Sequence, residues 1–199
     1  MKNAVSQKST RDAILDATDR LLTRNSYKKM TIDDLAQEVG IGKGSIYLHF
    51  ESKEEIALSH IDRIIERLKK NLRAIAEKPS ATDERLREML IERVLFRFDS
   101  VQHYTQSLND LLAVLRPKLL KRRERYFIEE ARIFAAVIAE GQTLSGFVVC
   151  DPLDAAQTLL SATNSLLPYS LSAVELGDRK NLAERVEKTA NILIRGLKV

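Results

Sequence analysis

The sequence predicts an all-α protein, and three observations support this prediction. Apolar residues recur at spacings of three and four along most of the chain, and no convincing run alternates as a strand does. Only seven glycines and four prolines interrupt the 199 residues. Hydrophobic residues make up 44% and charged residues 30%, enough for a buried core beneath solvated helix faces. We therefore expect about nine helices, arranged as one large or two small domains.

The first helix is expected to begin directly after Ser9. Serine is a preferred N-cap residue, and Asp12 stands at the position that completes a capping box. Residues 1–8 precede this cap and are predicted to form a polar arm. The apolar face that should cover the next two helices consists of Ile14, Leu15, Thr18, Leu21 and Leu22.

Residues 31–50 are predicted to form two short helices joined by a glycine turn. Thr31 and Asp34 form a second capping box at the start of the first helix. Gly40 ends that helix, because glycine adopts the left-handed cap conformation without steric cost. Ile41 is expected to fill the angle between the two helices. A helix, a tight turn and a second helix make a helix-turn-helix, a motif that places its second helix in the major groove of DNA.

The second helix, residues 43–50, is expected to have one inward and one outward face. At 100° per residue, Ile46 and Phe50 point inward together, and Gly44 and Leu48 point outward. Such an outward face suits a major groove, where leucine can meet a thymine methyl group and glycine permits close approach. The alternative interpretation is a small helical hairpin whose outer face meets only water.

Residues on and beside the outward face are predicted to contact DNA. Lys43 and Ser45 suit base edges, whereas basic, hydroxyl and imidazole groups nearby suit phosphate oxygens. A third capping box, Ser52 to Glu55, begins the next helix, whose first amides offer a further phosphate site. The predicted DNA-contacting residues are Thr31, Lys43, Gly44, Ser45, Tyr47, Leu48, His49 and Lys53.

The segment from Arg11 to Lys53 resembles the DNA-binding domain of the TetR/AcrR family of bacterial transcriptional regulators. The most specific match is the run Gly44-Ser45-Ile46-Tyr47-x-His49-Phe50-x-Ser52-Lys53, and weaker matches follow at residues 140–147 and 151–156. One departure is Gly42, where the family often has a serine or threonine cap. The resemblance implies a DNA-binding domain over residues 1–53 and a ligand-binding and dimerisation domain over residues 54–199.

Four helices are expected in the first part of the larger domain. Pro79 ends the first of them, because proline breaks a helix interior. Pro117 is expected to separate the third from the fourth, since proline suits a first helical turn. The expected ranges are 53–77, 82–100, 106–115 and 117–140.

A partly extended connector is expected over residues 141–150, followed by two further helices. Asp151 and Pro152 occupy the N-cap and first positions of the first helix, and Pro168 should kink or end it. The last helix is expected over residues 179–197. Both carry apolar stripes that can pack within one chain, but the family resemblance implies a dimer interface. Those stripes are Ala156, Leu159, Leu160, Thr163 and Leu167, and then Leu182, Val186, Ala190, Leu193 and Leu197.

The resemblance also implies a small-molecule effector held in the larger domain. Aromatic side chains with a few polar groups are typical of ligand pockets, and equally of an ordinary core. The candidates are Phe96, Phe98, His103, Tyr104, Asn109, Tyr126, Phe134 and Asn164. A basic cluster over residues 116–125 is interpreted as a solvated face or as a site for an anionic ligand group, such as a phosphate-bearing thioester cofactor.

Composition narrows the remaining function classes. The single cysteine, Cys150, allows no internal disulfide and is typical of a reducing cytoplasm. No signal-like or membrane-spanning apolar run is present. The three histidines lack metal-ligand spacing, so we expect no metal, no cofactor and no enzyme activity. The net charge of +4 is modest, so DNA affinity would depend on where the cations lie.

The predicted function is a homodimeric, ligand-responsive repressor that leaves a palindromic DNA operator when a small hydrophobic or amphipathic effector binds. The alternative is a helical small-molecule-binding or protein-partner module in which the helix-turn-helix is only a scaffold.

Overall fold

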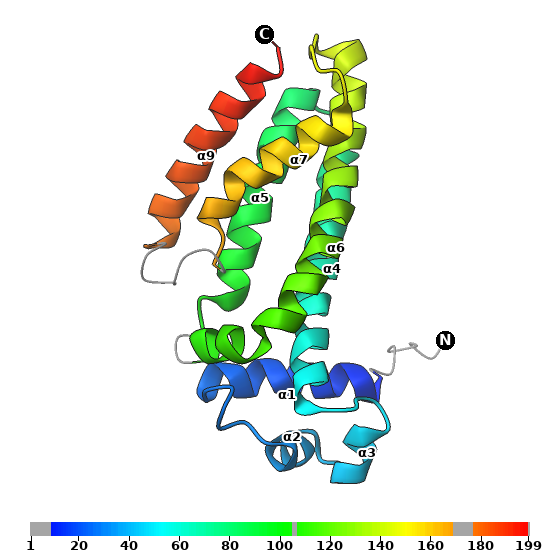
Figure 1. The fold of residues 1–199 in the computed structure, drawn as a ribbon, viewed down its shortest axis with the longest axis vertical. Helices are drawn as coiled ribbons and strands as arrows, with labels where there is room; N and C mark the ends of the chain where they lie inside the picture. The colour runs from blue at the N-terminus through cyan, green and yellow to red at the C-terminus, as the bar shows by residue number, and fades with distance from the viewer. Residues whose placement is uncertain (1–8, 105–106, 169–176, 199) are drawn as a thin grey trace, which may run out of the picture. The chain divides into compact units, whose positions relative to one another are not determined.

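The computed structural model describes residues 9–104, 107–168 and 177–198, and these residues confirm the all-α prediction. They form eight α-helices and one short 3-10 helix (Figure 1). The chain divides into two compact units. Unit 1 comprises Met1–Arg63 and Tyr104–Arg116, and unit 2 comprises Ile64–His103 and Pro117–Val199. The sequence had predicted a division after Lys53 instead, at the start of a helix that the two units share.

Unit 1 contains three short helices and the ends of two long ones. The short helices are α1 (Thr10–Arg24), α2 (Ile32–Val39) and α3 (Lys43–Tyr47). The long ones are α4 (Lys53–Ala76) and α6 (Ser107–Leu144), each of which continues into unit 2. The core of unit 1 is apolar and fully buried at its centre. It includes Ile14, Leu15, Leu22, Met30, Leu35, Ile46 and Ile56.

The helix caps of unit 1 agree with the capping signals in the sequence. The Ser9 hydroxyl accepts a hydrogen bond from the backbone N–H of Asp12, and Thr31 and Asp34 form a complete capping box. Gly40 has φ 76°, the left-handed conformation that the end of α2 requires. These local signals therefore set where α1 and α2 begin and where α2 ends.

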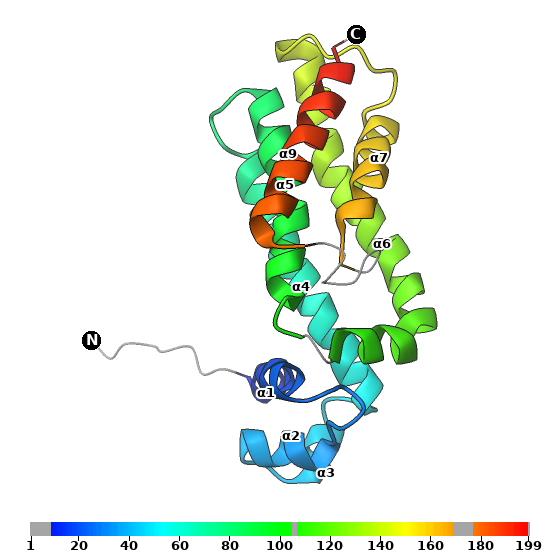
Figure 2. The same cartoon turned by 90° about the vertical axis from the view of Figure 1, so that its left-hand side faces the viewer.

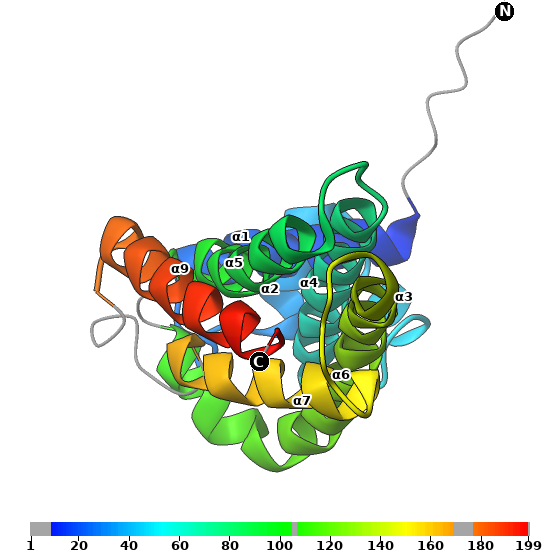
Figure 3. The ribbon, with the colours of Figure 1, turned by 90° about the horizontal axis from the view of Figure 1, so that it is seen from above.

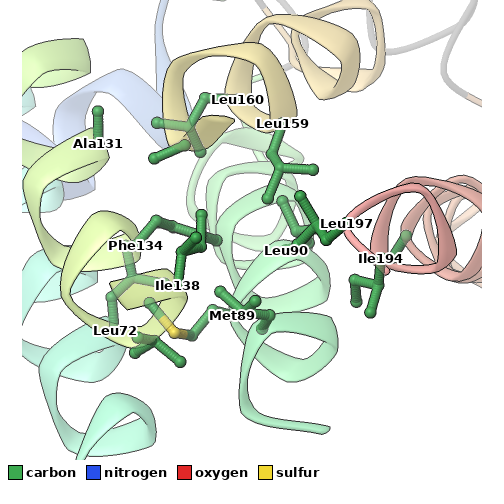
Figure 4. Packing of buried hydrophobic residues seen from close by; sticks show 14 of the residues in the cluster. Leu72, Met89, Leu90, Ala131, Phe134, Ile138, Leu159, Leu160, Ile194 and Leu197 are labelled. Carbon is green, nitrogen blue, oxygen red and sulfur yellow. The ribbon is translucent and has the colours of Figure 1, made fainter. Parts of the chain in front are cut away.

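Unit 2 is built around α5 (Thr82–Val101), α7 (Pro152–Thr163), the 3-10 helix η1 (Asn164–Leu166) and α9 (Arg179–Gly196). Helices α5, α7 and α9 pack on one another (Figures 2 and 3). The larger apolar cluster of this unit also takes side chains from α4 and α6. Figure 4 labels ten of its members, including Leu72, Met89, Phe134, Leu159 and Ile194.

The prediction of two helices over residues 106–140 was wrong, because α6 runs without a break from Ser107 to Leu144 with Pro117 inside it. The apolar stripe of Leu111, Leu115 and Leu119 continues through the proline and is buried. Proline removes the donor for the carbonyl four residues earlier, which belongs to Ala113. Ala113 is exposed, so water can satisfy that carbonyl, and packing outweighs the local signal.

A buried ionic cluster joins three elements of unit 2. On α5, Arg93 donates to Glu130 of α6 (2.9 Å) and to the Thr163 hydroxyl at the end of α7 (2.9 Å). Arg97 also contacts Glu130, and all three charged side chains are buried. Burial alone would raise the pKa of Glu130, but the two guanidiniums outweigh it and hold the pKa below its usual value. The carboxylate is therefore ionised within the core.

In the part of the chain that the structure describes, no helix is both long and apolar enough to cross a lipid bilayer. Within the same residues, no group of three His, Cys, Asp or Glu side chains is arranged to hold a metal ion.

Candidate nucleic-acid interface

The turn between α2 and α3 fixes the angle at which α3 stands on unit 1. The N–H groups of Gly40 and Ile41 both donate to the carbonyl of Ala36, at 2.9 and 3.0 Å. Ile46 and Phe50 then anchor the inward side of α3, and both are buried. The second helix is shorter than predicted, since it ends at Tyr47, and residues 48 and 49 form a turn. Because the turn is held by these hydrogen bonds and Ile46 and Phe50 are buried, the opposite face of α3 points away from the core of unit 1.

The outward face of α3 combines small, apolar and polar groups. Leu48 is 84% exposed and Tyr47 is 50% exposed. Lys43, Gly44 and His49 are also exposed, and Ser45 is half-buried. A Cβ atom added at Gly44 would meet nothing within 4 Å, so this glycine leaves an open strip of backbone on the face. The arrangement leaves room for another molecule to approach the backbone at Gly44.

Lys43 forms an exposed ion pair on this face. Its Nζ atom lies 2.9 Å from Oδ2 of Asp33 on α2. The hydrogen bond and the charge of Asp33 raise the pKa of Lys43, so the amine carries its proton at neutral pH. Ion pairs in water contribute little net free energy. The Lys43 amine can therefore exchange this carboxylate for another anion at little cost.

Lys53 has a structural role that the sequence did not reveal. Its Nζ donates to the carbonyls of Tyr27 (3.1 Å) and Met30 (3.0 Å) and lies 4.5 Å from the centre of the Tyr27 ring. Burial, with the nearby charge of Glu54, raises the pKa of Tyr27 to about 12. Lys53 thus fastens the start of α4 to the segment before α2. A phosphate contact by its third proton stays a prediction.

Thr31 is likewise engaged within the protein. Its hydroxyl donates to the carboxylate of Asp34 (2.8 Å) and accepts from the Asp34 backbone N–H (3.1 Å). These bonds hold the pKa of Asp34 below its usual value. The Thr31 side chain remains exposed, so its predicted contact with DNA is neither supported nor opposed by these bonds.

One cation beside the interface was missed by the sequence reasoning. The guanidinium of Arg11 in α1 lies 5.0 Å from the centre of the Phe50 ring, next to the end of the α3 turn. Arg11 is exposed. Nothing in its sequence surroundings distinguishes it, because the contact joins residues far apart in the chain.

Comparisons with known proteins agree with this geometry. Residues 14–59 match the model of bacterial regulatory proteins of the tetR family. The transcriptional regulator EthR of Mycobacterium tuberculosis is 35% identical over 71 residues, which are 36% of this chain and 33% of that protein. A crystal structure of a TetR/AcrR-family regulator from Thermobifida fusca is 26% identical, with a TM-score of 0.69 over 94% of this chain and 97% of that one.

Residues 14–59 therefore form a domain of the tetR family of bacterial regulatory proteins. The part of the chain that matches EthR corresponds to only about a third of the length of that protein. A Bacillus subtilis regulator, FadR, crystallised in complex with stearoyl-CoA, shares the fold with a TM-score of 0.66. That comparison covers 92% of this chain and 97% of FadR at 16% identity.

The predicted dimer-interface residues lie in the core of unit 2. All except the half-buried Leu193 are buried in the single chain. Nine of the ten are therefore already covered within one chain, and their contact with a second copy stays a prediction. The same stripes pack α7 and α9 against α5 and each other. The nine buried residues are Ala156, Leu159, Leu160, Thr163, Leu167, Leu182, Val186, Ala190 and Leu197.

The predicted pocket residues do not form a single group. Phe96, Phe98, Tyr126, Phe134 and Asn164 belong to unit 2, where the amide oxygen of Asn164 accepts a hydrogen bond from Arg93 (2.9 Å). His103, in the same unit, is exposed. Tyr104 and Asn109 belong instead to unit 1. The unit 2 residues therefore remain candidates for an effector site, whereas Tyr104 has partners inside unit 1.

The basic cluster over residues 116–125 lies along α6. Arg116, Lys118, Lys121 and Arg125 are exposed, and Arg122 and Arg123 are half-buried. The Arg125 guanidinium lies 3.9 Å from Glu129 and 5.4 Å from the centre of the Tyr126 ring. A largely exposed cationic stretch agrees with both interpretations, a solvated face and an anion site.

Proposed function

We propose that this protein is a sequence-specific DNA-binding repressor that a small molecule releases from a palindromic operator. The observation that carries the proposal is the outward face of α3. Two buried anchors hold it in place, and it exposes Leu48, the open backbone of Gly44 and the charged amine of Lys43. The match of residues 14–59 to the tetR family supports the same conclusion.

In this proposal α3 enters the major groove with Lys43 and Ser45 towards base edges. Leu48 meets a thymine methyl group, and Tyr47, His49 and Lys53 approach phosphates. Asp33 keeps the Lys43 amine on the face until a base or phosphate oxygen replaces it. Lys43→Ala and Ser45→Ala should therefore change sequence preference, whereas Tyr47→Ala should weaken binding to all sequences.

A palindromic operator needs two copies of α3, and we propose that a homodimer supplies them. With the buried stripes assigned to the core, the second copy must pack on the exposed faces of α7 and α9. Ile192, which is 72% exposed, is the large apolar side chain on that side of α9. Ile192→Glu should shift the sedimentation coefficient from that of a dimer towards that of a monomer.

The effector is proposed to bind in unit 2 and to be hydrophobic or amphipathic. FadR, which shares the fold, was crystallised with an acyl-CoA, which supports a ligand with both apolar and anionic parts. A ligand shifts the conformational equilibrium only by its preference for one state. Release from DNA therefore requires that the effector bind more tightly to the state in which the two copies of α3 are wrongly spaced.

The test is selection of bound fragments from a random duplex library, with Tyr47→Ala as the control. A palindromic sequence that the wild type enriches and the variant does not supports the proposal. If the wild type enriches no sequence even at low salt, the alternative of a scaffold module would replace it.

A further inference from the structure

The first turn of α1 places a cation beside the end of α3. The guanidinium of Arg11 lies over the ring of Phe50, 5.0 Å from the ring centre. Arg11 is exposed, whereas Phe50 is buried and directly follows the exposed residues Leu48 and His49. All of these residues belong to unit 1. The contact therefore positions a positive charge next to the face that is proposed to read DNA.

The N–H donors of the Arg11 guanidinium are not used by the part of the chain that the structure describes. A guanidinium has five N–H donors, and an aromatic ring attracts its charge without supplying an oxygen acceptor. Among the described residues, no carboxylate or carbonyl oxygen accepts from Arg11. The nearest carboxylate in sequence, that of Asp12, instead accepts from the hydroxyl of Ser9 (2.6 Å). The donors of Arg11 are therefore available to an external anion.

Two other cations of unit 1 differ from Arg11 in this respect. Nζ of Lys43 lies 2.9 Å from a carboxylate oxygen of Asp33, and Nζ of Lys53 donates to two backbone carbonyls. An anion that approaches either amine must compete with these oxygens. An anion that approaches Arg11 displaces no described hydrogen-bond acceptor, so its attraction is not offset by the loss of an internal hydrogen bond.

The position of Arg11 suits the phosphate backbone of DNA rather than the bases. In a bound helix-turn-helix, the first residues of the second helix contact base edges, and contacts to the phosphates fix the orientation of the protein. Arg11 lies beside the opposite end of α3, where the side chain of Phe50 is buried. At that end we expect phosphate oxygens to be closer than base edges.

The guanidinium of Arg11 is also suited to a phosphate by its shape and its restraint. Two parallel N–H groups can donate to two oxygens of one phosphate. An arginine side chain loses rotamer freedom when it binds, and this loss offsets part of the gain. Contact with the Phe50 ring, which is only 3% exposed, restricts Arg11 before DNA arrives. The remaining loss on binding is therefore smaller.

We propose that Arg11 is a phosphate-binding residue of the DNA interface: the Phe50 ring holds its guanidinium beside the end of α3, and the guanidinium donates to a phosphodiester of the operator backbone. Because a phosphate carries no sequence information, Arg11 contributes affinity to every duplex and no preference among sequences. This inference rests on the function proposed above, and it adds a contact from α1 to those proposed for α3 and α4.

The test measures the affinity of the wild type and of Arg11→Gln for the selected duplex over a range of salt concentrations. Each phosphate contact contributes about 0.9 to the slope of log affinity against log salt, so a dimer that loses one contact in each copy should show a slope smaller by about 1.8. Affinity at low salt should fall about tenfold for each copy, the value of one hydrogen bond between charged groups.

Arg24→Gln is the matched control, because it removes the same charged group from the other end of α1. Arg24 lies in the last turn, and its side chain is 62% exposed. Its partner Glu38 keeps a second arginine, Arg20, at 2.6 Å. The slope in this variant should equal that of the wild type, since only a direct phosphate contact changes the number of counterions released.

Arg11→Lys separates a phosphate contact from a purely structural role. Lysine keeps the charge but not the planar fork, so this variant should retain the wild-type slope and recover part of the affinity. In Arg11→Gln, a duplex of scrambled sequence should lose the same factor in affinity as the selected duplex. Without DNA, the melting temperature of Arg11→Gln should fall by no more than about 4 °C, because an exposed cation–π contact is weak.

A wild-type slope in Arg11→Gln, or an equal reduction of the slope in Arg24→Gln, would overturn the phosphate contact. A loss of affinity confined to the selected duplex would overturn it as well, because Arg11 would then act on sequence recognition. If the wild type and Arg11→Gln bind the selected duplex equally, the proposed function stands and only this inference fails. If the wild type binds no duplex, both fail.

Discussion

Removal of the exposed leucine on α3 tests the DNA-contacting face with little effect on folding. Leu48 is 84% exposed, so Leu48→Ala should change the free energy of unfolding by less than about 0.5 kcal/mol. In a groove, the same substitution removes three buried carbon groups, each worth up to about 0.8 kcal/mol. Since a groove covers the side chain only partly, we expect a loss of about 1–2 kcal/mol per reading helix, roughly 5- to 30-fold in affinity.

The matched control is Leu144→Ala near the end of α6. Leu144 is 70% exposed and belongs to unit 2. The two substitutions therefore remove the same side chain from similarly exposed positions and differ in the unit that carries it. Fluorescence anisotropy with the selected duplex, over a range of salt concentrations, measures both. The slope of affinity against salt should not change in either variant, since no charge is removed. Leu48→Ala binding as tightly as the wild type, or Leu144→Ala losing as much, would refute the assignment of this face.

Three further substitutions test other parts of the account. Gly44→Ala should leave thermal stability unchanged or raise it by up to about 1 kcal/mol, because alanine favours a helix, yet DNA affinity should fall as the methyl group blocks close approach. Gly141→Ala should lower the melting temperature, because its Cβ would lie 2.2 Å from a ring carbon of Phe147; unaltered melting would contradict the packing. Glu130→Gln should cost about 3–5 kcal/mol in urea denaturation, because it removes the buried carboxylate that pairs with two buried guanidiniums. Since the folded state lowers the pKa of Glu130, its contribution should be present above about pH 4.5 and fade as the pH falls further, and the variant should lack that dependence.

Local signals in the sequence predicted most of the helix boundaries. The caps at Ser9, Thr31 and Asp151 and the glycine at residue 40 act through neighbouring backbone groups, so they can be recognised without knowledge of the fold. The break predicted at Pro117 was wrong for the opposite reason. There, burial of distant side chains outweighs a local preference, and a single sequence does not show which side chains become buried.

The same limit applies to the functional residues. The outward face of α3 could be predicted from periodicity alone, because the two residues that anchor its inward side, Ile46 and Phe50, lie one helical turn apart in the chain. The stripes of α7 and α9 were correctly recognised as apolar, but periodicity does not say whether the partner is the same chain or a second copy. The structural role of Lys53 depends on contacts with residues 23 and 26 positions away, so no local pattern indicated it.

Photo-crosslinking from α3 tests the central claim most directly. A photoreactive phenylalanine analogue would replace Leu48 in one variant and Leu144 in another, since both positions are exposed and tolerate a bulky side chain. We predict that the position 48 variant crosslinks to bases within each half of the selected palindrome, and that the position 144 variant does not crosslink to the duplex. A bound duplex that crosslinks from position 144 and never from position 48 would contradict the claim that this face reads DNA.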